Sequence, residues 1–459
     1  MMLLPTARTP TSERACSCPL PLPCECSYPA LLKARFRSVR VRFAGEPLLH
    51  NGHILLASSI VAAALGAIFW VFATRWYSPA TVGLSYAAVS AAGLLSAVGR
   101  FNLNSVLVRF LPGAGRHTRR LVLRCYIASA VASALAAVGF LALIPWISPS
   151  LNFLREPLVA VAFVVVTAGY SLFVLQDGAL TGLRRTGWVL GENAFFAVVK
   201  AAALAVCALF AVGTGILVSW AAALLVTVLL TNIVLFRRAI PTHQRAPGAD
   251  AAPVPPRVAR YAVADFLGNI SGIVACSVVP LMVLATLGAA QNAYYSLAWV
   301  IADSLYMAAY SMGSSLVVEA AHAPERLAEH ARRMLRHTGL LVLGAVAVIV
   351  IGAPWLLRLF GPGYAEHGTT VLRLMALSAL PNVVLSLATD VARVRRALPW
   401  MIGLQLVYAV LVIALTAGLL PVLGLTGVGL AWLIAGTVLA LPLLVALPRW
   451  LPHPADRRS

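Results

Sequence analysis

About twelve apolar stretches, each long enough to cross a membrane, determine what this chain of 459 residues can fold into. A membrane-spanning helix needs about 20 consecutive apolar residues. Hydrophobic residues make up 61% of the chain and charged residues only 11%, too few to cover a water-exposed surface. The sequence therefore predicts an all-α polytopic membrane protein. The stretches lie near 52–73, 81–108, 121–146, 157–177, 188–212, 214–236, 259–286, 289–317, 337–360, 369–391, 398–419 and 424–447.

The second half of the chain repeats the first. The heptad Thr214–Trp220 is echoed by Thr426–Trp432, and Asp177 is echoed by Asp390 at nearly the same offset. Each unit holds an even number of spans, so both halves share one orientation and are related by an axis along the membrane normal. We expect two six-helix bundles related by a pseudo-two-fold, at 50–236 and 259–448.

Polar segments flank and separate these bundles. Residues 237–258 are basic and rich in proline, which predicts a cytoplasmic linker. Residues 449–459 form a second cytoplasmic tail. Residues 1–49 are either a disordered cytoplasmic tail or sequence upstream of the true start. Four cysteines in this segment suit either a zinc site or a disordered tail, and the prolines between the pairs favour the disordered tail without a metal.

The distribution of arginine predicts the orientation in the membrane. Nearly all of the 35 basic residues lie in the tails and in alternate loops, and the opposite loops hold only Arg75, Arg155 and Arg358. Basic loops remain in the cytoplasm. We therefore expect a multi-pass protein of the plasma membrane with both termini in the cytoplasm, and a nucleic-acid partner is unnecessary to explain the charge. The cytoplasmic basic loops include Arg184, Arg185, Arg395 and Arg396.

A few charged residues interrupt the apolar stretches. A charge at the bilayer centre costs about 2.5–3.5 kcal/mol on insertion scales, so it usually faces a partner or water. Lys200 follows Glu192 by eight residues, which places both on a similar side of one helix. Both residues either face a polar lumen or form salt bridges to other helices that hold the bundle together.

The other intramembrane charges also have two interpretations. Asp265 and Asp303 either bind a coupling ion or form ion pairs with Lys200 or Arg100. Arg100 lies deep enough to contact an anion, whereas Arg373 lies near a helix end, from which an arginine can reach the interface.

The sequence favours transport over catalysis. It contains no P-loop, no HExxH and no GxSxG motif following a strand. The predicted outer loops are short and nearly uncharged, unlike those expected of a membrane glycosyltransferase. We expect no enzymatic activity, no cofactor and no metal.

Three stretches resemble the oligosaccharide flippases of the multidrug/oligosaccharidyl-lipid/polysaccharide (MOP) superfamily, which includes Wzx-type flippases and MATE exporters. The likeness covers about residues 50–448 and identifies the superfamily better than the substrate. The stretches are Gln176 to Lys200, Leu359 to Pro381, and Gly83 to Phe110.

This resemblance implies a function. The family moves an undecaprenyl-diphosphate-linked oligosaccharide to the outer leaflet for polysaccharide biosynthesis, by alternating access of two bundles. It implies that Arg100, Lys200 and Arg373 hold the diphosphate, and that acidic residues bind a proton or sodium ion if a gradient drives the cycle. Partners would be the lipid bilayer, the lipid-linked glycan and polysaccharide-synthesis proteins.

Two other functions remain open. One is a MATE-like or major-facilitator-like secondary exporter of small molecules. Major-facilitator proteins carry GxxxDRxGRR after the second helix, whereas the loop from Arg109 to Arg120 lacks its aspartate. The other is a membrane-embedded assembly partner for polysaccharide synthesis. The glycan, the coupling ion and the oligomeric state are not determined by the sequence.

Overall fold

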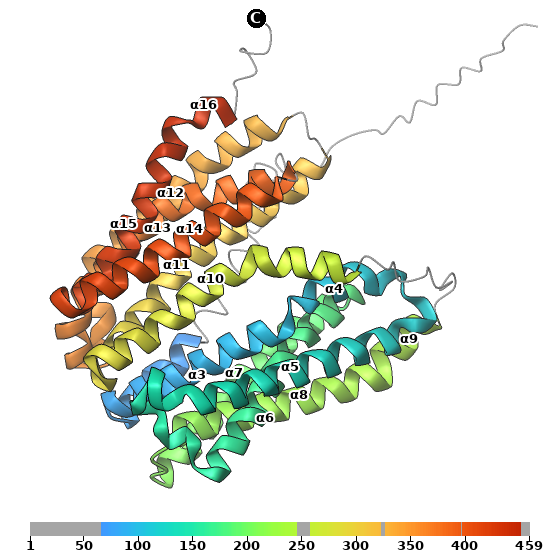
Figure 1. Ribbon diagram of the computed structural model, residues 1–459, viewed down its shortest axis with the longest axis horizontal. Helices are drawn as coiled ribbons and strands as arrows, with labels where there is room; N and C mark the ends of the chain where they lie inside the picture. The colour runs from blue at the N-terminus through green and yellow to red at the C-terminus, as the bar shows by residue number, and fades with distance from the viewer. Residues whose placement is uncertain (1–65, 246–257, 323–325, 396, 451–459) are drawn as a thin grey trace, which may run out of the picture.

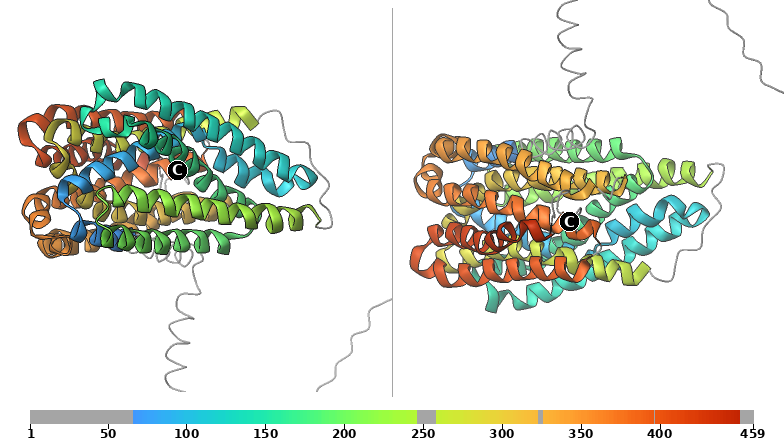
Figure 2. Two further views of the ribbon diagram at one scale, coloured as in Figure 1. Left: turned by 90° about the horizontal axis from the view of Figure 1, so that it is seen from below. Right: turned by 90° about the horizontal axis from the view of Figure 1, so that it is seen from above.

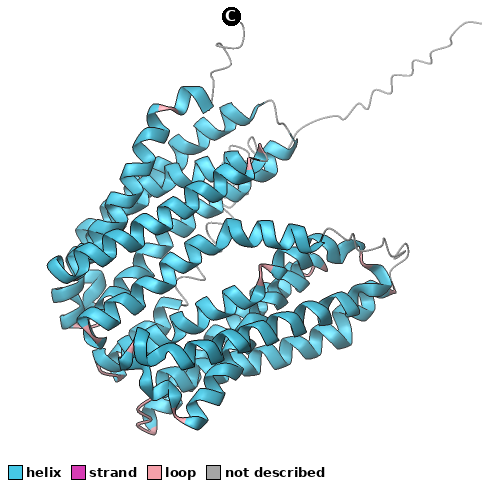
Figure 3. Ribbon diagram, in the orientation of Figure 1, coloured by secondary structure: helices cyan, strands magenta, loops and turns pink. Residues whose placement is uncertain are grey.

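The computed structural model describes residues 66–245, 258–322, 326–395 and 397–450. The tail predicted at 1–49, most of the tail at 449–459 and residues 246–257 of the linker lie outside the described residues. The side chain of Asp265 also lies outside them. Within the described ranges the chain forms helices joined by short loops, and no strand is found (Figure 3).

The first half begins with a helix that is described from residue 66 to residue 76. The sixth helix continues past Val234 through a π-helical turn, Leu235–Ala239, and so enters the segment predicted as a linker. The other helices of this half are α3 (Pro79–Arg100), α4 (Leu103–Phe110), α5 (Thr118–Ile147), α6 (Pro157–Gly182), α7 (Thr186–Leu209), α8 (Gly215–Val234) and α9 (Ile240–Gln244).

The second half contains six long helices and a short terminal one. They are α10 (Val258–Leu287), α11 (Ala289–His322), α12 (Leu327–Arg358), α13 (Pro362–Val394), α14 (Leu398–Leu423), α15 (Leu425–Val445) and α16 (Leu447–Trp450). Ten helices of the described chain are long and apolar enough to cross a membrane. The 34-residue α11 and the helix at 66–76 occupy the positions of the two remaining predicted spans.

The second predicted span, 81–108, is a broken helix. It stops at Arg100 and restarts at Leu103. Between them Phe101 and Asn102 have φ values of 46° and 52°, a left-handed conformation that is unfavourable for a bulky residue such as phenylalanine. Sequence hydropathy does not detect such a break because it averages over a whole span and carries no information on the φ angle of a single residue.

The two halves form separate helix groups that diverge toward one end. Figure 1 shows α5 to α9 in one group and α11 to α16 in the other, with α10 between them. The views in Figure 2 show that the helices of both groups run in a similar direction. Because α9 and α16 follow the sixth and twelfth spans, the diverging end is the end that carries the basic loops.

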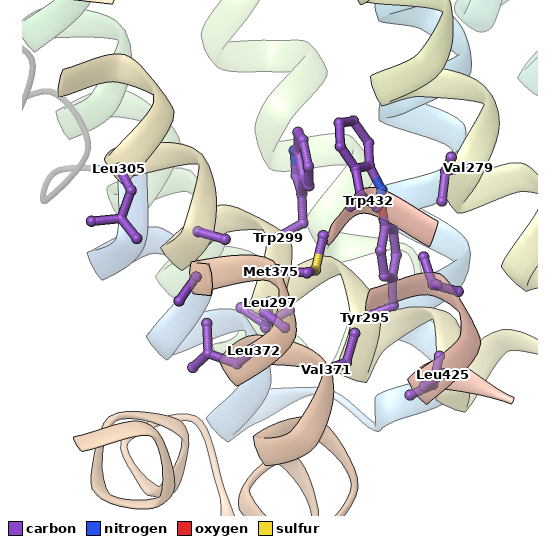
Figure 4. Close-up of a cluster of buried hydrophobic side chains, with 14 of the residues drawn as sticks. Val279, Tyr295, Leu297, Trp299, Leu305, Val371, Leu372, Met375, Leu425 and Trp432 are labelled. Carbon is purple, nitrogen blue, oxygen red and sulfur yellow. The ribbon is translucent and has the colours of Figure 1, made fainter. Parts of the chain in front are cut away.

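The buried cores follow the same division. Away from the basic loops, one core combines Phe69, Leu204 and Ile216 of the first half with Val279 and Trp432 of the second. Figure 4 shows Trp432 and its neighbours within this core. At the basic end each half instead has a core of its own. These cores contain Leu107, Leu111 and Leu180 in the first half, and Met312, Leu316 and Leu387 in the second.

The halves meet most closely where α3 crosses α11. A Cβ atom at Gly83 would lie 2.8 Å from the carbonyl carbon of Ala289 and 3.0 Å from the amide nitrogen of Ala293. The amide of Asn292 donates a buried 2.9 Å hydrogen bond to the carbonyl oxygen of Gly83. Small residues allow two membrane helices to approach this closely.

The repeated heptad begins the last long helix of each half. Gly215 lies against Cys207 of α7, and Gly427 lies against Leu419 of α14. In both places a Cβ atom would collide with the preceding helix. The repeat therefore preserves glycine at a close contact between two consecutive helices, and at Gly215 the Tyr77 side chain lies close as well.

The crossing at Gly83 gives a stability test. We expect Gly83→Ala to lower the free energy of unfolding by about 1–3 kcal/mol, because the added methyl group collides with the backbone of α11. Thermal unfolding in detergent, followed by tryptophan fluorescence, measures the change. Gly93→Ala is the matched control because it lies in the same helix and gives the same gain in helix propensity, up to about 1 kcal/mol. Its new methyl group meets only a Tyr170 ring carbon, at 3.5 Å. Equal unfolding temperatures for the two variants would contradict this account of the crossing.

Candidate functional site

Arg100 lies at the end of α3, directly before the helix break. Its guanidinium donates a 3.2 Å hydrogen bond to the Ser96 hydroxyl and interacts electrostatically with Asp177 and Tyr170. Helix α4 then begins at Leu103 without a side-chain cap. The first amide groups of a helix lack partners within it and carry partial positive charge. The break therefore places a cation and the positive end of a helix at neighbouring points along the second span.

One carboxylate lies close to Arg100, and a second lies close to the first. Asp177 of α6 accepts a 3.3 Å hydrogen bond from the Asn193 amide of α7 and interacts with the Arg100 guanidinium. Glu192 is only 5% exposed and interacts with Asp177. The Thr231 side chain lies close to Glu192, but neither Glu192 carboxylate oxygen makes a hydrogen bond of normal geometry. The group is a mixed-charge polar cluster contributed by four helices of the first half.

The sequence does not identify Asp177 as a site residue. The repeat matches it with Asp390, but a shared position in two halves does not indicate a polar cluster. In the structure the two aspartates differ. Asp390 forms a 3.2 Å ion pair with Arg393 one turn further along α13, whereas Asp177 lies near Arg100 of another helix.

Lys200 lies on the same helix as Glu192 but has different neighbours. Its ammonium nitrogen lies 4.3 Å from the ring centroid of Phe69 and 5.0 Å from that of Phe196. The side chain is 9% exposed, and within the described chain no carboxylate pairs with it. The alternative of an ion pair between Lys200 and Asp303 of another helix does not appear among these contacts. Two aromatic faces stabilise the cation instead.

Asp303 is a charged residue at the junction of the halves. It interacts electrostatically with Tyr86 of α3, Cys276 of α10, and Tyr306 and Tyr310 of α11. Tyr310 is exposed, and Tyr306 is buried with its hydroxyl 2.6 Å from that of Ser378. No hydrogen bond or ion pair engages the Asp303 carboxylate within the described residues. Within the described residues its environment is therefore mainly phenolic.

Arg373 has a partner that explains its position within the bundle. Its Nε donates a 2.9 Å hydrogen bond to the carbonyl oxygen of Val350 on α12. In a regular helix that oxygen would accept a hydrogen bond from residue 354, but Pro354 has no N–H. Arg373 thus satisfies a carbonyl group that the proline leaves free, which is costly to leave unpaired at membrane depth. Its predicted role as a substrate cation stays a prediction.

The remaining predicted residues lie in or next to the loops at the basic end. Arg184, Arg185 and Arg395 are exposed, and Arg396 lies outside the described residues. Asp265 belongs to α10, but its side chain is outside the described residues. In the described chain no three His, Cys, Asp or Glu side chains come together as a metal site.

The bond between Arg373 and the proline-freed carbonyl can be tested with a double-mutant cycle. We expect Arg373→Ala to lower the free energy of unfolding by about 1–2 kcal/mol, because it leaves a carbonyl group at membrane depth without a donor. In a Pro354→Ala background the same substitution should cost much less, since the restored N–H of residue 354 pairs with Val350. Chemical or thermal unfolding in detergent gives the four values. An equal cost in both backgrounds would show that Arg373 contributes in another way.

Comparison with known proteins shows which transporters share this fold. No protein-family model matches the chain, and no curated protein matches its sequence. Among solved structures, an inward-facing multidrug-resistance MATE transporter of the MOP superfamily has a TM-score of 0.69 at 14% identity, covering 87% of this chain and 99% of that one. An outward-facing MATE transporter of the same superfamily gives 0.65 at 14% identity, covering 89% and 96%.

A flippase shares the fold as well. The lipid II flippase MurJ, in an inward closed conformation, gives a TM-score of 0.62 at 13% identity, covering 86% of this chain and 87% of that one. Sequence identity this low establishes the fold and leaves the substrate open. The chain therefore has the two-bundle, all-α fold of the MOP-superfamily transporters.

Proposed function

We propose that this protein moves an undecaprenyl-diphosphate-linked oligosaccharide from the cytoplasmic to the outer leaflet of the plasma membrane. The observation that carries the proposal is Lys200, a cation at membrane depth whose described neighbours are two aromatic rings and no carboxylate. An ammonium group in such a place is available to an anion brought by a substrate. A diphosphate headgroup on a lipid is such an anion, and its prenyl chain can remain in the surrounding bilayer.

Arg100 supports the same substrate class. It lies beside a break in the second span, and half-helices that begin at a break direct positive dipole ends toward anionic substrate groups in other transporters. Guanidinium groups bind phosphate oxygens in a forked, bidentate manner. In the absence of substrate, Asp177 offsets part of the positive charge of Arg100. A diphosphate would compete with this carboxylate for the guanidinium.

The divergence of the helix groups supports alternating access. We propose that the bundles at 50–236 and 259–448, joined by the linker at 237–258, rock against each other. With the basic loops in the cytoplasm, the diverging end faces the cytoplasm. The higher TM-score to the inward-facing MATE structure than to the outward-facing one agrees with this state.

The acidic residues provide candidate coupling sites. Glu192 next to Asp177, and Asp303 among tyrosines, are carboxylates that a proton or a sodium ion would neutralise. We propose that one of them takes up the coupling ion while the other remains a fixed element of its bundle. Asp265 stays a prediction, because its side chain is outside the described residues.

Asp303 favours a second function. A carboxylate surrounded by aromatic rings is also suited to an organic cation, which aromatic faces and an anion stabilise together. The alternative is thus a secondary exporter of small cationic molecules, with Asp303 rather than Lys200 as the central charge.

A reconstituted assay distinguishes the flippase from the exporter. Proteoliposomes receive a fluorescent undecaprenyl-diphosphate oligosaccharide, and loss of the inner-leaflet pool reports headgroup movement. We expect Lys200→Met to slow this movement at least about tenfold, because it removes a charge-assisted contact of about 1.5–3 kcal/mol. Lys200→Arg should retain a larger part of the rate, since it keeps the charge in a similar volume.

The outcomes of this assay are distinct. Unfolding temperature confirms that each variant is folded before its rate is compared. If the glycan lipid does not cross with any variant, or if Lys200→Met matches the parent, the flippase proposal is wrong. If the protein moves an organic cation, and Asp303→Asn abolishes this movement while Lys200→Met does not, the exporter function is established instead.

A further inference from the structure

An exposed arginine links the two halves at the end where they share a core. Arg75 lies in the last turn of the helix at 66–76 in the first half. Its Nε donates a 3.1 Å hydrogen bond to the carbonyl oxygen of Leu359, and its Nη2 donates a 3.3 Å hydrogen bond to that of Arg358. Both acceptors lie at the C-terminal end of α12 in the second half.

The chemistry of this contact suits a strong but releasable bond. The last carbonyl groups of a helix lack partners within it and form the negative end of its dipole. A guanidinium presents two donors in a fixed fork and carries the opposite charge. Because the Arg75 side chain is exposed, water can replace the protein at both donors and acceptors when the contact opens.

The buried hydrogen bond between Asn292 and Gly83 also links the halves, but water cannot replace it in this way. The Asn292 amide and the Gly83 carbonyl are enclosed by α3 and α11, so breaking their bond would leave two polar groups unpaired in an apolar environment. The exposed contact of Arg75 is expected to open.

We propose that Arg75 is a latch that holds the end remote from the basic loops closed, and that its release from the α12 terminus permits this end to open. The proposal rests on the alternating access of the proposed function, but not on the identity of the substrate. It makes Arg75 a conformational residue and predicts that its removal shifts the population toward the state open at this end.

The chain provides a matched control. Arg373 also donates its Nε to a backbone carbonyl of α12, that of Val350. It does so from α13, within the same half, so its bond is unaffected by the position of one half relative to the other. Loss of Arg373 therefore removes a similar hydrogen bond without removing a link between the halves.

Electron paramagnetic resonance between two spin labels tests the latch without any substrate. The seven native cysteines are replaced, and labels are attached at Phe210→Cys and Val422→Cys, two exposed positions at the loop ends of α7 and α14. In nanodiscs we expect Arg75→Ala to raise the ratio of the long-distance to the short-distance population about tenfold. Arg75→Lys, which keeps the charge but not the fork, should give an intermediate ratio.

The control variant and two possible outcomes decide whether Arg75 is a latch. Arg373→Ala should leave the distance distribution of the parent unchanged. A distribution for Arg75→Ala identical to that of the parent would overturn the latch, as would equal shifts for Arg75→Ala and Arg373→Ala. Monodisperse elution and the unfolding temperature identify a misfolded variant, and Arg75→Gln then takes the place of Arg75→Ala. Since no substrate is present, a failed flipping assay has no bearing on this result.

Discussion

The arrangement of the two halves depends on the close approach of α3 and α11 at Gly83. The two backbones can come this close because Gly83 has no side chain. The side-chain amide of Asn292 on α11 donates a hydrogen bond to the Gly83 carbonyl on α3. Dispersion and buried hydrogen bonds rather than hydrophobic burial hold helices together in a bilayer. Because Gly83 and Ala293 are nearly equivalent in the internal repeat, the crossing lies close to the axis that relates the halves. The remaining helices can diverge from this crossing because each half has a core of its own at the basic end.

Backbone groups that lack a hydrogen-bond partner within a regular helix occur at a proline, at a helix end and at a helix break. Pro354 frees the Val350 carbonyl, which Arg373 takes up, and the end of α12 leaves carbonyl groups that Arg75 takes up. The break at Phe101 and Asn102 leaves the start of α4 without a side-chain cap. In an apolar solvent such groups must find partners within the protein. At two of these three places an arginine donates a hydrogen bond to the backbone carbonyl. An arginine in an apolar stretch can therefore be a structural donor as readily as a contact for substrate.

The scaffold is repeated while its charges are not. Glu192 and Lys200 have apolar counterparts in the second half, Leu404 and Val412, and Asp303 has Gly93 as its counterpart in the first half. In the structure these charges lie in separate places: a mixed cluster around Asp177 and a lysine between two rings in the first half, and a carboxylate among phenols at the junction. A duplicated frame thus holds chemically different surfaces on its two sides. Under the proposed function, the anionic headgroup and the coupling ion would bind at different places among these asymmetric charges.

The sequence by itself determined the fold class, the positions of most spanning helices and the repeat, because apolar length and loop charge are properties of consecutive residues. It also identified most of the charged residues buried in the bundles. The partners of those charges were decided only by the tertiary structure. Lys200 meets the rings of Phe69 and Phe196, Arg373 meets a carbonyl that a proline frees, and Asp177 lies near Arg100 beside a helix break that hydropathy does not detect. These contacts depend on which faces of distant helices meet, and that follows from packing between helices far apart in the chain rather than from the pattern within each one.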